Sequence, residues 1–321
     1  MFEFLTSPNF PNAGLGIEER SITAVSLDGG RGGLRIRQCA TSSIPPGVIK
    51  GDFFDQNIID ESAFIKCLED TLAVAGLLNQ KRWSVSLPGS SARTAIVTLE
   101  TEPSSKSEWQ EIFDWKAEQT FGITASDLRI SRRKISNDVE GRSRYFTTAI
   151  RLAVIDEYET IFERFGRRAG LILPRVISEA TWLHNRLAGD ALLLSAQPGG
   201  FSGLLLRGDE PAVVRSVTCS PSEAGNEIYR LLMFYHDRYG GILENILLIG
   251  EEIGRSDVVA AAAEAFGREI DVLDADDLGL DRAGTGLSFD VLAAPAGLAS
   301  LHFGSQSSAK AAAETFFRRI P

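Results

Sequence analysis

The hydrophobic and polar positions of this chain follow two alternating periods, one typical of strands and one typical of helices. Short apolar or alternating runs predict strands near the start, at 14–17, 22–27, 34–42 and 83–87. An apolar face that repeats at helical spacing, with Phe64, Leu68 and Leu72, predicts a helix over 60–77. This mixture of strands and helices is typical of an α/β fold.

A unit with a different pattern occupies about 93–170. Its order is strand, helix, strand, strand and helix, predicted at 95–99, 109–116, 128–136, 145–154 and 157–169. The segment 137–141 is rich in turn-forming residues and joins the two central strands. We therefore expect a small α+β subdomain inserted into the first half of the chain. In its first helix, Trp109 and Trp115 stand on different faces, so we expect one in the core and the other at the surface.

The second half of the chain repeats the opening pattern. A helix over 178–187 precedes three strands, predicted at 191–196, 203–207 and 212–217. Further elements are predicted at 222–239, 245–249, 257–266 and 289–302. Because the strand meander recurs, the sequence predicts two related lobes. We place the first lobe at 1–189, with the insertion at 93–170, and the second lobe at 190–321, with a helical or α+β insertion at about 220–270.

The composition is that of a folded globular protein. Of its 321 residues, 44% are hydrophobic and 24% are charged, and the length exceeds what one hydrophobic core usually covers. Acidic residues outnumber basic ones by 43 to 33, and the net charge of -10 disfavours binding to nucleic acid or to an anionic membrane surface. One basic cluster is predicted to be a solvated strand face: Arg129, Arg132, Arg133, Lys134, Arg142, Arg144 and Arg151.

Other features concern the cellular compartment. Cys39, Cys67 and Cys219 are far apart and lack a C-x-x-C spacing, which argues against a disulfide framework or a zinc site. The start of the chain lacks the basic residues and the apolar run of a signal peptide. No run of the sequence approaches the ~20 apolar residues that a membrane-spanning helix needs. We therefore expect a cytoplasmic protein that reaches the inner membrane through a partner, without direct membrane insertion.

Several segments resemble one known family. The run SIPPGVIKGDFFD (43–55), the strand pair before it and the run WSVSLPGSS (83–91) resemble the amino-terminal region of PilM-type type IV pilus assembly proteins. The run PAGLA (295–299) resembles the pattern near the end of PilM proteins, and the unit at 93–170 resembles the extra subdomain of FtsA and PilM. This resemblance to the FtsA/PilM branch of the actin-like ATPase superfamily implies an actin-like, two-lobed fold, which is ribonuclease H-like and duplicated.

The family's nucleotide-binding pattern can be compared with this chain residue by residue. In the first hairpin of the family, an acid, a glycine and a lysine hold magnesium and phosphate. Their positions are taken here by Gly16, Glu18 and Thr23. A carboxylate at Glu18 would repel phosphate oxygens. A shift of one or two residues would instead bring Glu18 or Glu19 into the metal-binding role, and that alternative stays open.

Two other motifs of the family are altered as well. Ser195 and Gln197 stand at the acid and glycine positions of the second hairpin, and Gly250 and Glu251 begin what is a triple glycine in the family. These losses predict that the motif residues form only a vestigial nucleotide cleft. We therefore expect no catalytic residues, no metal ligands and no cofactor, with the binding of ATP and Mg²⁺ disfavoured. The residues favour a pseudo-ATPase over an active ATPase.

The resemblance also implies a partner. PilM proteins are cytoplasmic and bind the short cytoplasmic tail of the membrane protein PilN in a groove between the core of the first half and the inserted subdomain. Here that groove would be bounded by 83–99 and 128–152, and its candidate contacts are Trp83, Val85, Ile96, Ile130 and Ile150. The expected role is a scaffold of a type IV pilus or related secretion machine. Further expected partners are other machine components and a second copy of the chain, but not nucleic acid.

Three alternatives stay open at this point. One is an ATP-binding actin-like pilus or cell-division protein with unusual phosphate turns. Another is a cytoplasmic domain like that of the type II secretion protein GspL, a family that continues into a transmembrane helix. The third is an FtsA-type division protein, which would end in a basic amphipathic membrane helix. The tail at 310–319 is short, and we predict a packing helix there instead.

Overall fold

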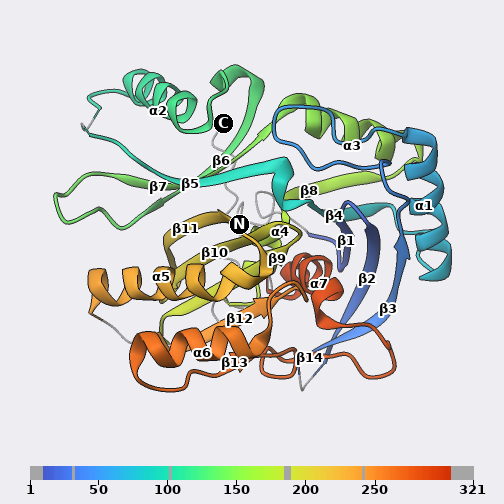
Figure 1. Ribbon diagram of the computed structural model, residues 1–321. Helices are drawn as coiled ribbons and strands as arrows, with labels where there is room; N and C mark the ends of the chain where they lie inside the picture. Colours follow the sequence, from blue (N-terminus) through green and yellow to red (C-terminus); the bar gives the residue numbers. More distant parts are fainter. Residues whose placement is uncertain (1–9, 31–32, 101–102, 184–188, 241–242, 305–321) are drawn as a thin grey trace.

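The computed structural model describes residues 10–30, 33–100, 103–183, 189–240 and 243–304 (Figure 1). The tail helix predicted at 310–319 lies outside these residues, as does the end of the helix predicted at 178–187. The described strands form a six-stranded, a five-stranded and a three-stranded sheet.

The six-stranded sheet is the core of the first lobe. Its strands lie in the order β14, β3, β2, β1, β4 and β8, with the bounds Leu280–Asp281, Gly33–Ser43, Ser21–Gly30, Ala13–Ile17, Arg82–Leu87 and Arg168–Pro174. β1, β2 and β3 form an antiparallel meander, whereas β4, β8 and β14 join it by parallel pairing. Helices α1 (Glu61–Val74) and α3 (Leu152–Arg164) bury their apolar residues against this sheet. The predicted meander is therefore confirmed.

Both ends of α1 follow from the sequence. The side chain of Asp60 accepts a hydrogen bond from the backbone N–H of Ala63 at 3.0 Å, as a helix N-cap does. Gly76, with φ of 71°, takes the left-handed conformation that ends a helix at little cost. Phe64, Leu68 and Leu72 are buried on the predicted face.

The five-stranded sheet is the core of the second lobe. Its strands lie in the order β11, β10, β9, β12 and β13, with the bounds Glu210–Thr218, Gly200–Arg207, Ala191–Gln197, Asn245–Ile249 and Val272–Leu273. Helices α5 (Pro221–Tyr239) and α6 (Arg255–Phe266) pack with this sheet around a second apolar cluster. The second lobe thus opens with the same antiparallel meander as the first.

The inserted subdomain has its own small core. Its sheet has the order β5, β7 and β6, with the bounds Ala92–Thr98, Arg144–Arg151 and Leu128–Ile135. Helix α2 (Lys106–Phe121) packs on it through Phe113, Ala117 and Phe121. Trp109 stacks on Phe113 with ring centroids 5.0 Å apart, whereas Trp115 is 56% exposed. The prediction that the two tryptophans face different ways is therefore confirmed.

Two helices lie between the large sheets and connect the lobes. Helix α4 (Arg175–Ala180) runs from β8 of the first sheet towards β9 of the second, and α7 (Phe289–Gly304) packs against β1, β2 and α4. The indole N–H of Trp182 donates to the backbone oxygen of Ala293 at 2.7 Å. A side chain at Gly14 would stand only 1.9 Å from the backbone oxygen of Pro295, so glycine is what lets β1 approach α7.

Around α3 the structure differs from the prediction. We expected a strand over 145–154 and a helix over 157–169, but β7 ends at Arg151 and α3 already begins at Leu152. Val154, Ile155 and Tyr158 are buried, so the apolar face of the helix starts before residue 157, where we had placed the beginning of the helix. Gly166, with φ of 61°, follows the helix, and the apolar run after it forms β8, which we had missed.

The second lobe also differs from the prediction. The insertion expected at about 220–270 is wrong, because β12 lies within it and pairs with β9 at the centre of the second sheet. Helices α5 and α6 pack on that same sheet. In addition, β14 pairs with β3 of the first sheet, although we had assigned all of 190–321 to the second lobe.

Candidate functional site

One group of charged residues gathers between the two lobes. Glu18 lies in the turn between β1 and β2, and Arg175 and Glu179 lie one turn apart on α4. Arg175 Nε is 2.6 Å from Glu179 Oε1, and Arg175 Nη1 is 3.8 Å from Glu18 Oε2. Asp290, in the first turn of α7, adds its charge to the surroundings of Glu179. We call Glu18, Arg175, Glu179 and Asp290 the inter-lobe cluster.

Burial controls the ionisation of this cluster. The Glu179 side chain is fully buried, and Arg175 and Glu18 are 13% and 30% exposed. Burial raises the pKa of Glu18 to about 7, with Arg175 opposing the shift and Glu179, Glu19 and Glu252 adding to it. Burial likewise raises the pKa of Glu179, against the effect of Arg175 and of the Ser195 hydroxyl. The cluster therefore retains a proton in a pH range where exposed carboxylates are ionised.

Arg175 is the cation that stabilises the buried carboxylates of the cluster. Its burial alone would lower the pKa of its guanidinium, but Glu179 and Glu18 more than offset this and hold the pKa above its usual value. One oxygen of Glu179, Oε2, makes no hydrogen bond within normal geometric limits, although the Ser195 hydroxyl is near enough to lower the pKa of Glu179. Within the inter-lobe cluster, the guanidinium of Arg175 is therefore the one group that compensates the negative charge of the carboxylates.

A second contact joins the lobes near Gly250. This glycine follows β12, and its backbone N–H donates to Asp290 Oδ1 at 2.6 Å. The other oxygen of Asp290 accepts from the Ser288 hydroxyl at 2.6 Å. Gly250 has φ of 106°, and an added side chain would meet the backbone oxygen of Ala196 at 2.7 Å. The amide of Gly250 is therefore already bound to a carboxylate of the chain itself.

The predicted cleft residues are only partly brought together. Glu18 and Ser195 both lie beside α4, and Gly250 is tied to it through α7. Thr23 instead lies in β2, with its hydroxyl 3.0 Å from that of Thr41 on β3. Gly16 packs under the ring of Pro295. Glu251 is exposed, and the Gln197 side chain reaches across to Gly89 of the first half.

Sequence reasoning missed three members of the cluster, Arg175, Glu179 and Asp290. The spacing of Arg175 and Glu179, four residues apart, is a signal for an ion pair on a helix. This signal was hidden because we started the helix at 178.

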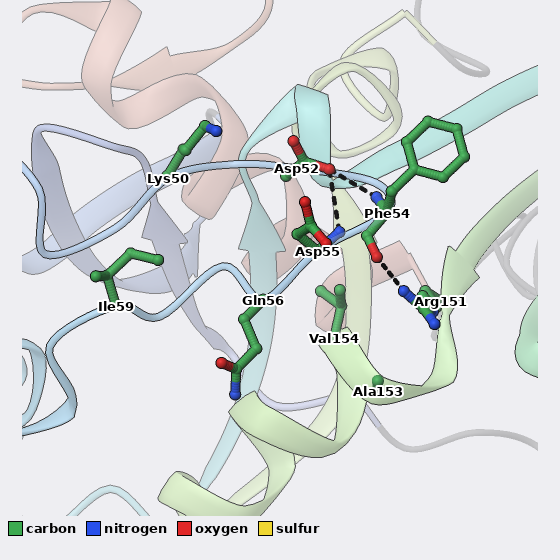
Figure 2. Close-up of a pocket in the computed structure, with 9 residues that line it drawn as sticks. All are labelled: Lys50, Asp52, Phe54, Asp55, Gln56, Ile59, Arg151, Ala153 and Val154. Atoms are coloured by element: carbon green, nitrogen blue, oxygen red, sulfur yellow. Dashed lines mark hydrogen bonds between the residues drawn. The ribbon is translucent and has the colours of Figure 1, made fainter.

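A pocket lies elsewhere on the first lobe, beside the inserted subdomain. Its volume is about 480 Å³, and it lies between the loop at 50–59 and the start of α3 (Figure 2). We call the loop at 50–59 the pocket loop. The lining residues are Lys50, Asp52, Phe54, Asp55, Gln56, Ile59, Arg151, Ala153 and Val154. Phe54 and Ile59 are 43% and 60% exposed, so both present apolar surface to solvent.

The pocket loop is held from several sides. Glu157 Oε2 on α3 accepts from the backbone N–H of Asn57 at 3.0 Å and of Ile58 at 3.2 Å. Asp52 Oδ1 accepts from the N–H groups of Phe54 and Asp55, and these bonds hold the pKa of Asp52 below its usual value. Arg151 donates to the backbone oxygen of Phe54. The loop is therefore a fixed wall of the pocket.

The same loop connects the lobe to the inserted subdomain. Phe53 is buried in the core of that subdomain, while its neighbour Phe54 is one of the residues that line the pocket. The guanidinium of Arg93, on β5, lies 4.8 Å from the ring centre of Phe53 and 4.6 Å from that of Phe54. The pocket thus spans the junction between the first lobe and the inserted subdomain.

The predicted partner contacts need correction. Trp83, Val85 and Ile150 are buried in the core between the first sheet and its helices, so they cannot touch a partner unless that core opens. Ile96 and Ile130 are half-buried and pack against neighbouring apolar clusters. The error has a simple cause, because inward and outward positions of a strand cannot be told apart when both faces are covered.

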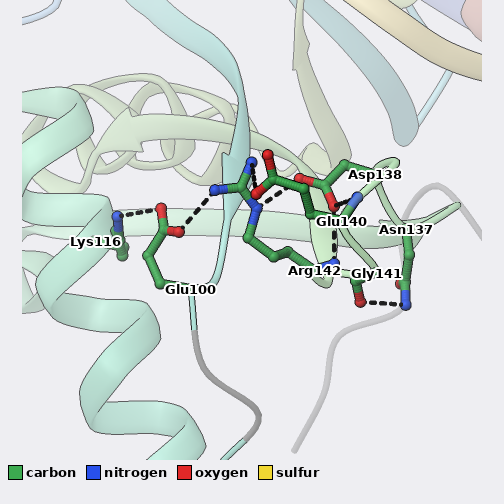
Figure 3. A network of polar contacts seen from close by, with 7 residues as sticks. All are labelled: Glu100, Lys116, Asn137, Asp138, Glu140, Gly141 and Arg142. Atoms are coloured by element: carbon green, nitrogen blue, oxygen red, sulfur yellow. Dashed lines mark hydrogen bonds and ion pairs between the residues drawn. The ribbon is translucent and has the colours of Figure 1, made fainter.

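The basic cluster of the inserted subdomain is largely paired, so the predicted solvated face is wrong for most of it. Arg142 contacts Glu100, Asp138 and Glu140, and Glu100 also reaches Lys116 (Figure 3). Two other members of the cluster are half-buried: Arg132 lies over the ring of Trp109, and Arg133 lies near Glu210 of the second lobe.

A chain of the PilM–PilN type IV pilus biogenesis complex is similar in structure, with a TM-score of 0.70 and 17% identity over 91% of this chain and 98% of that one. This chain has the actin-like fold of PilM. The PilM-like architecture accounts for the two lobes, the connecting helices and the inserted subdomain together.

Other solved structures are more distant. The cytoplasmic domain of EpsL, from the type II secretion system of Vibrio cholerae, has a TM-score of 0.47 and 12% identity over 83% of this chain and 92% of that one. The ethanolamine utilization protein EutJ from Carboxydothermus hydrogenoformans has a TM-score of 0.45 and 10% identity over 92% and 93%. No family model and no curated protein sequence matches the chain. In the part of the chain that the structure describes, no helix combines the length and the apolar character needed to span a membrane.

Proposed function

We propose that this protein is a non-catalytic cytoplasmic adaptor of a type IV pilus or related secretion machine. In this role it binds the short cytoplasmic tail of a PilN-like protein of the inner membrane. The observation that carries the proposal is a structural likeness at a TM-score of 0.70 to a chain of the PilM–PilN complex, in a molecule with a pocket beside the inserted subdomain.

The chemistry of the pocket supports a peptide ligand. Phe54 and Ile59 offer exposed apolar surface that a hydrophobic side chain of a tail would cover. The exposed ammonium of Lys50 and the exposed carboxylate of Asp55 stand at the same wall, where they can pair with charged or backbone groups of an extended segment. A volume of about 480 Å³ suits a few side chains rather than a whole domain.

The inter-lobe cluster supports a role without ATP. Glu18, Glu179 and Asp290 place carboxylates between the lobes, and only Arg175 among the cluster carries positive charge. A triphosphate entering this region would meet repulsion from the carboxylates, and Asp290 already occupies the amide of Gly250. The adaptor therefore needs neither nucleotide nor Mg²⁺ in this proposal.

Cross-linking from the pocket tests the partner. We would place a photo-reactive amino acid at the exposed Gln56 of the full chain and irradiate it with native membranes. The expected product is a bitopic membrane protein joined through a short cytoplasmic tail. Cross-links to soluble proteins alone would contradict the adaptor role.

Affinity measurements with that tail then test the pocket. For a synthetic peptide of the tail, Phe54→Ala and Ile59→Ser are expected to weaken binding about tenfold or more, because each removes apolar contact area. Val74→Ser is the matched control, since Val74 is an exposed apolar residue of α1 outside the pocket. Equal affinity for all these variants would place the binding site elsewhere.

A thermal shift assay tests the proposal that the protein does not bind nucleotide. Saturating ATP with Mg²⁺ is expected to leave the melting temperature unchanged, whereas a true ligand would raise it by several degrees through mass action. Such a rise would favour the alternative of an ATP-binding actin-like protein.

A further inference from the structure

The two lobes are joined by charged and polar contacts that run through both connecting helices. On one side, Glu18 in the β1–β2 turn faces Arg175, which pairs with Glu179 on α4 beside Ser195 of β9. On the other side, Asp290 on α7 binds the amide of Gly250 after β12. The first path runs from an element of the first lobe to one of the second, and the second path joins the connecting helix α7 to the second lobe.

We infer that the inter-lobe cluster is a built-in electrostatic link, in which Arg175 holds the β1–β2 turn of the first lobe to α4 and the second lobe. The link uses only groups of the chain, so it forms without a bound ligand. This inference does not rest on the proposed partner.

The burial of the cluster gives the link its strength. Arg175 and Glu179 are almost fully removed from solvent, so their attraction is weakly screened and their geometry is fixed by packing. Loss of the guanidinium would leave Glu179 buried among the like charges of Glu18 and Asp290. A buried carboxylate without a cation is strongly disfavoured. We therefore expect the lobes to separate locally, so that water reaches Glu179.

The charged groups that act on Glu18 come from several neighbouring elements. Glu19 belongs to the same turn, Arg175 and Glu179 to α4, and Glu252 to the segment after β12. The buried phenol of Tyr158, on α3, also feels the charge of Glu18, which contributes to raising the pKa of Tyr158 after the larger effect of burial. Arg175 is the single cation among these groups, and it faces more carboxylates than it can neutralise.

Hydrogen exchange of the full chain, followed by mass spectrometry, tests this link. Arg175→Met is expected to speed exchange roughly tenfold in two segments at once, the β1–β2 turn at 18–21 and the end of β9 at 195–197. Exchange in α2 is expected to stay unchanged, because the inserted subdomain has its own core. Arg164→Met is the matched control, since Arg164 pairs with Glu61 at an exposed site.

The pattern of exchange decides the outcome. An increase in both segments that spares α2 and is absent from the control supports the link. An increase in only one segment, an increase spread over all sheets, or no change would overturn it. None of these results involves a partner peptide, so a failure of the adaptor proposal stays distinguishable.

If Arg175→Met does not fold, a second pair of variants tests the same inference. Asp290→Ala removes the carboxylate that holds Gly250, whereas Ser288→Ala removes only the hydroxyl that donates to Asp290. Asp290→Ala is expected to speed exchange of the Gly250 amide roughly tenfold more than Ser288→Ala does. Equal exchange in the two variants would overturn the inference.

Discussion

At the scale of single residues, three carboxylates, those of Glu18, Glu179 and Glu252, act on one guanidinium, that of Arg175. Glu179 takes the close contact at 2.6 Å, and Glu18 lies farther away at 3.8 Å. Burial and the neighbouring acids therefore outweigh Arg175 at Glu18, and its pKa rises to about 7 from an ordinary value of 4.5. Its charge changes within the physiological range of pH.

This shift predicts how stability depends on pH. Between pH 4.5 and about 7 the folded chain holds a proton on Glu18 that the unfolded chain has released, so the free energy of unfolding falls as pH rises through this window. We expect a loss of about 1–2 kcal/mol from Glu18, reduced from the full shift because its side chain is 30% exposed. Urea unfolding over this range of pH measures it.

Glu18→Gln provides the comparison for this prediction. The amide cannot ionise, so the variant is expected to lose less stability than the original chain as pH rises from about 5 to about 8. The slope that remains includes contributions from Glu179 and Glu157, whose pKa values are also raised by burial. Identical slopes in the two proteins would show that Glu18 is ionised throughout this window.

At the scale of elements, the pocket depends on α3 holding the pocket loop. Glu157 accepts two backbone N–H groups of that loop, from Asn57 and Ile58. We expect Glu157→Ala to weaken binding of the tail peptide roughly fivefold, because the loop must then be ordered on binding. Titration of the peptide, with the exposed Glu163→Ala on the same helix as control, measures this effect. A loss of affinity in both variants would point to α3 itself instead of the loop.

Elements with strong local signals could be predicted from sequence. The strand at 245–249 and the helix capped by Asp60 match the structure because their apolar patterns and cap residues are local. The strand β8 was missed because the helical pattern before it ran on past Gly166 in our interpretation. The pair of Glu18 and Arg175 was missed because their contact depends on how the chain returns between the lobes, which no local pattern encodes.

At the scale of the whole molecule, the family resemblance predicted the architecture correctly but did not predict which residues lie at the surface. It predicted the two lobes and the inserted subdomain, which the likeness to a chain of the PilM–PilN complex bears out at a TM-score of 0.70. The partner residues predicted on β4 and β7 are buried in the structure, and the pocket lies at the neighbouring loop instead. The position of a partner groove stays a prediction, and which side chains the packing leaves exposed could not be derived from the resemblance.

Glu18 and Glu19 are consecutive residues with different neighbours. Glu18 faces Arg175 between the lobes, whereas Glu19 Oε1 accepts from the backbone N–H of Gly51, in the pocket loop, at 3.0 Å. Glu19→Ala, which removes the acceptor, is expected to leave the affinity for the tail nearly unchanged, and to remove any change that peptide binding causes in hydrogen exchange at 195–197. An exchange response at 195–197 as large as that of the original chain would contradict this coupling.

The β1–β2 turn therefore has a mechanical consequence. In the proposed role, a membrane protein that moves while its tail is bound would pull on the pocket loop, and this tension would pass through Gly51 and Glu19 into a turn that also contacts the opposite half of the molecule. Force applied at the rim would be shared by the entire body of the protein, and would not peel away one loop.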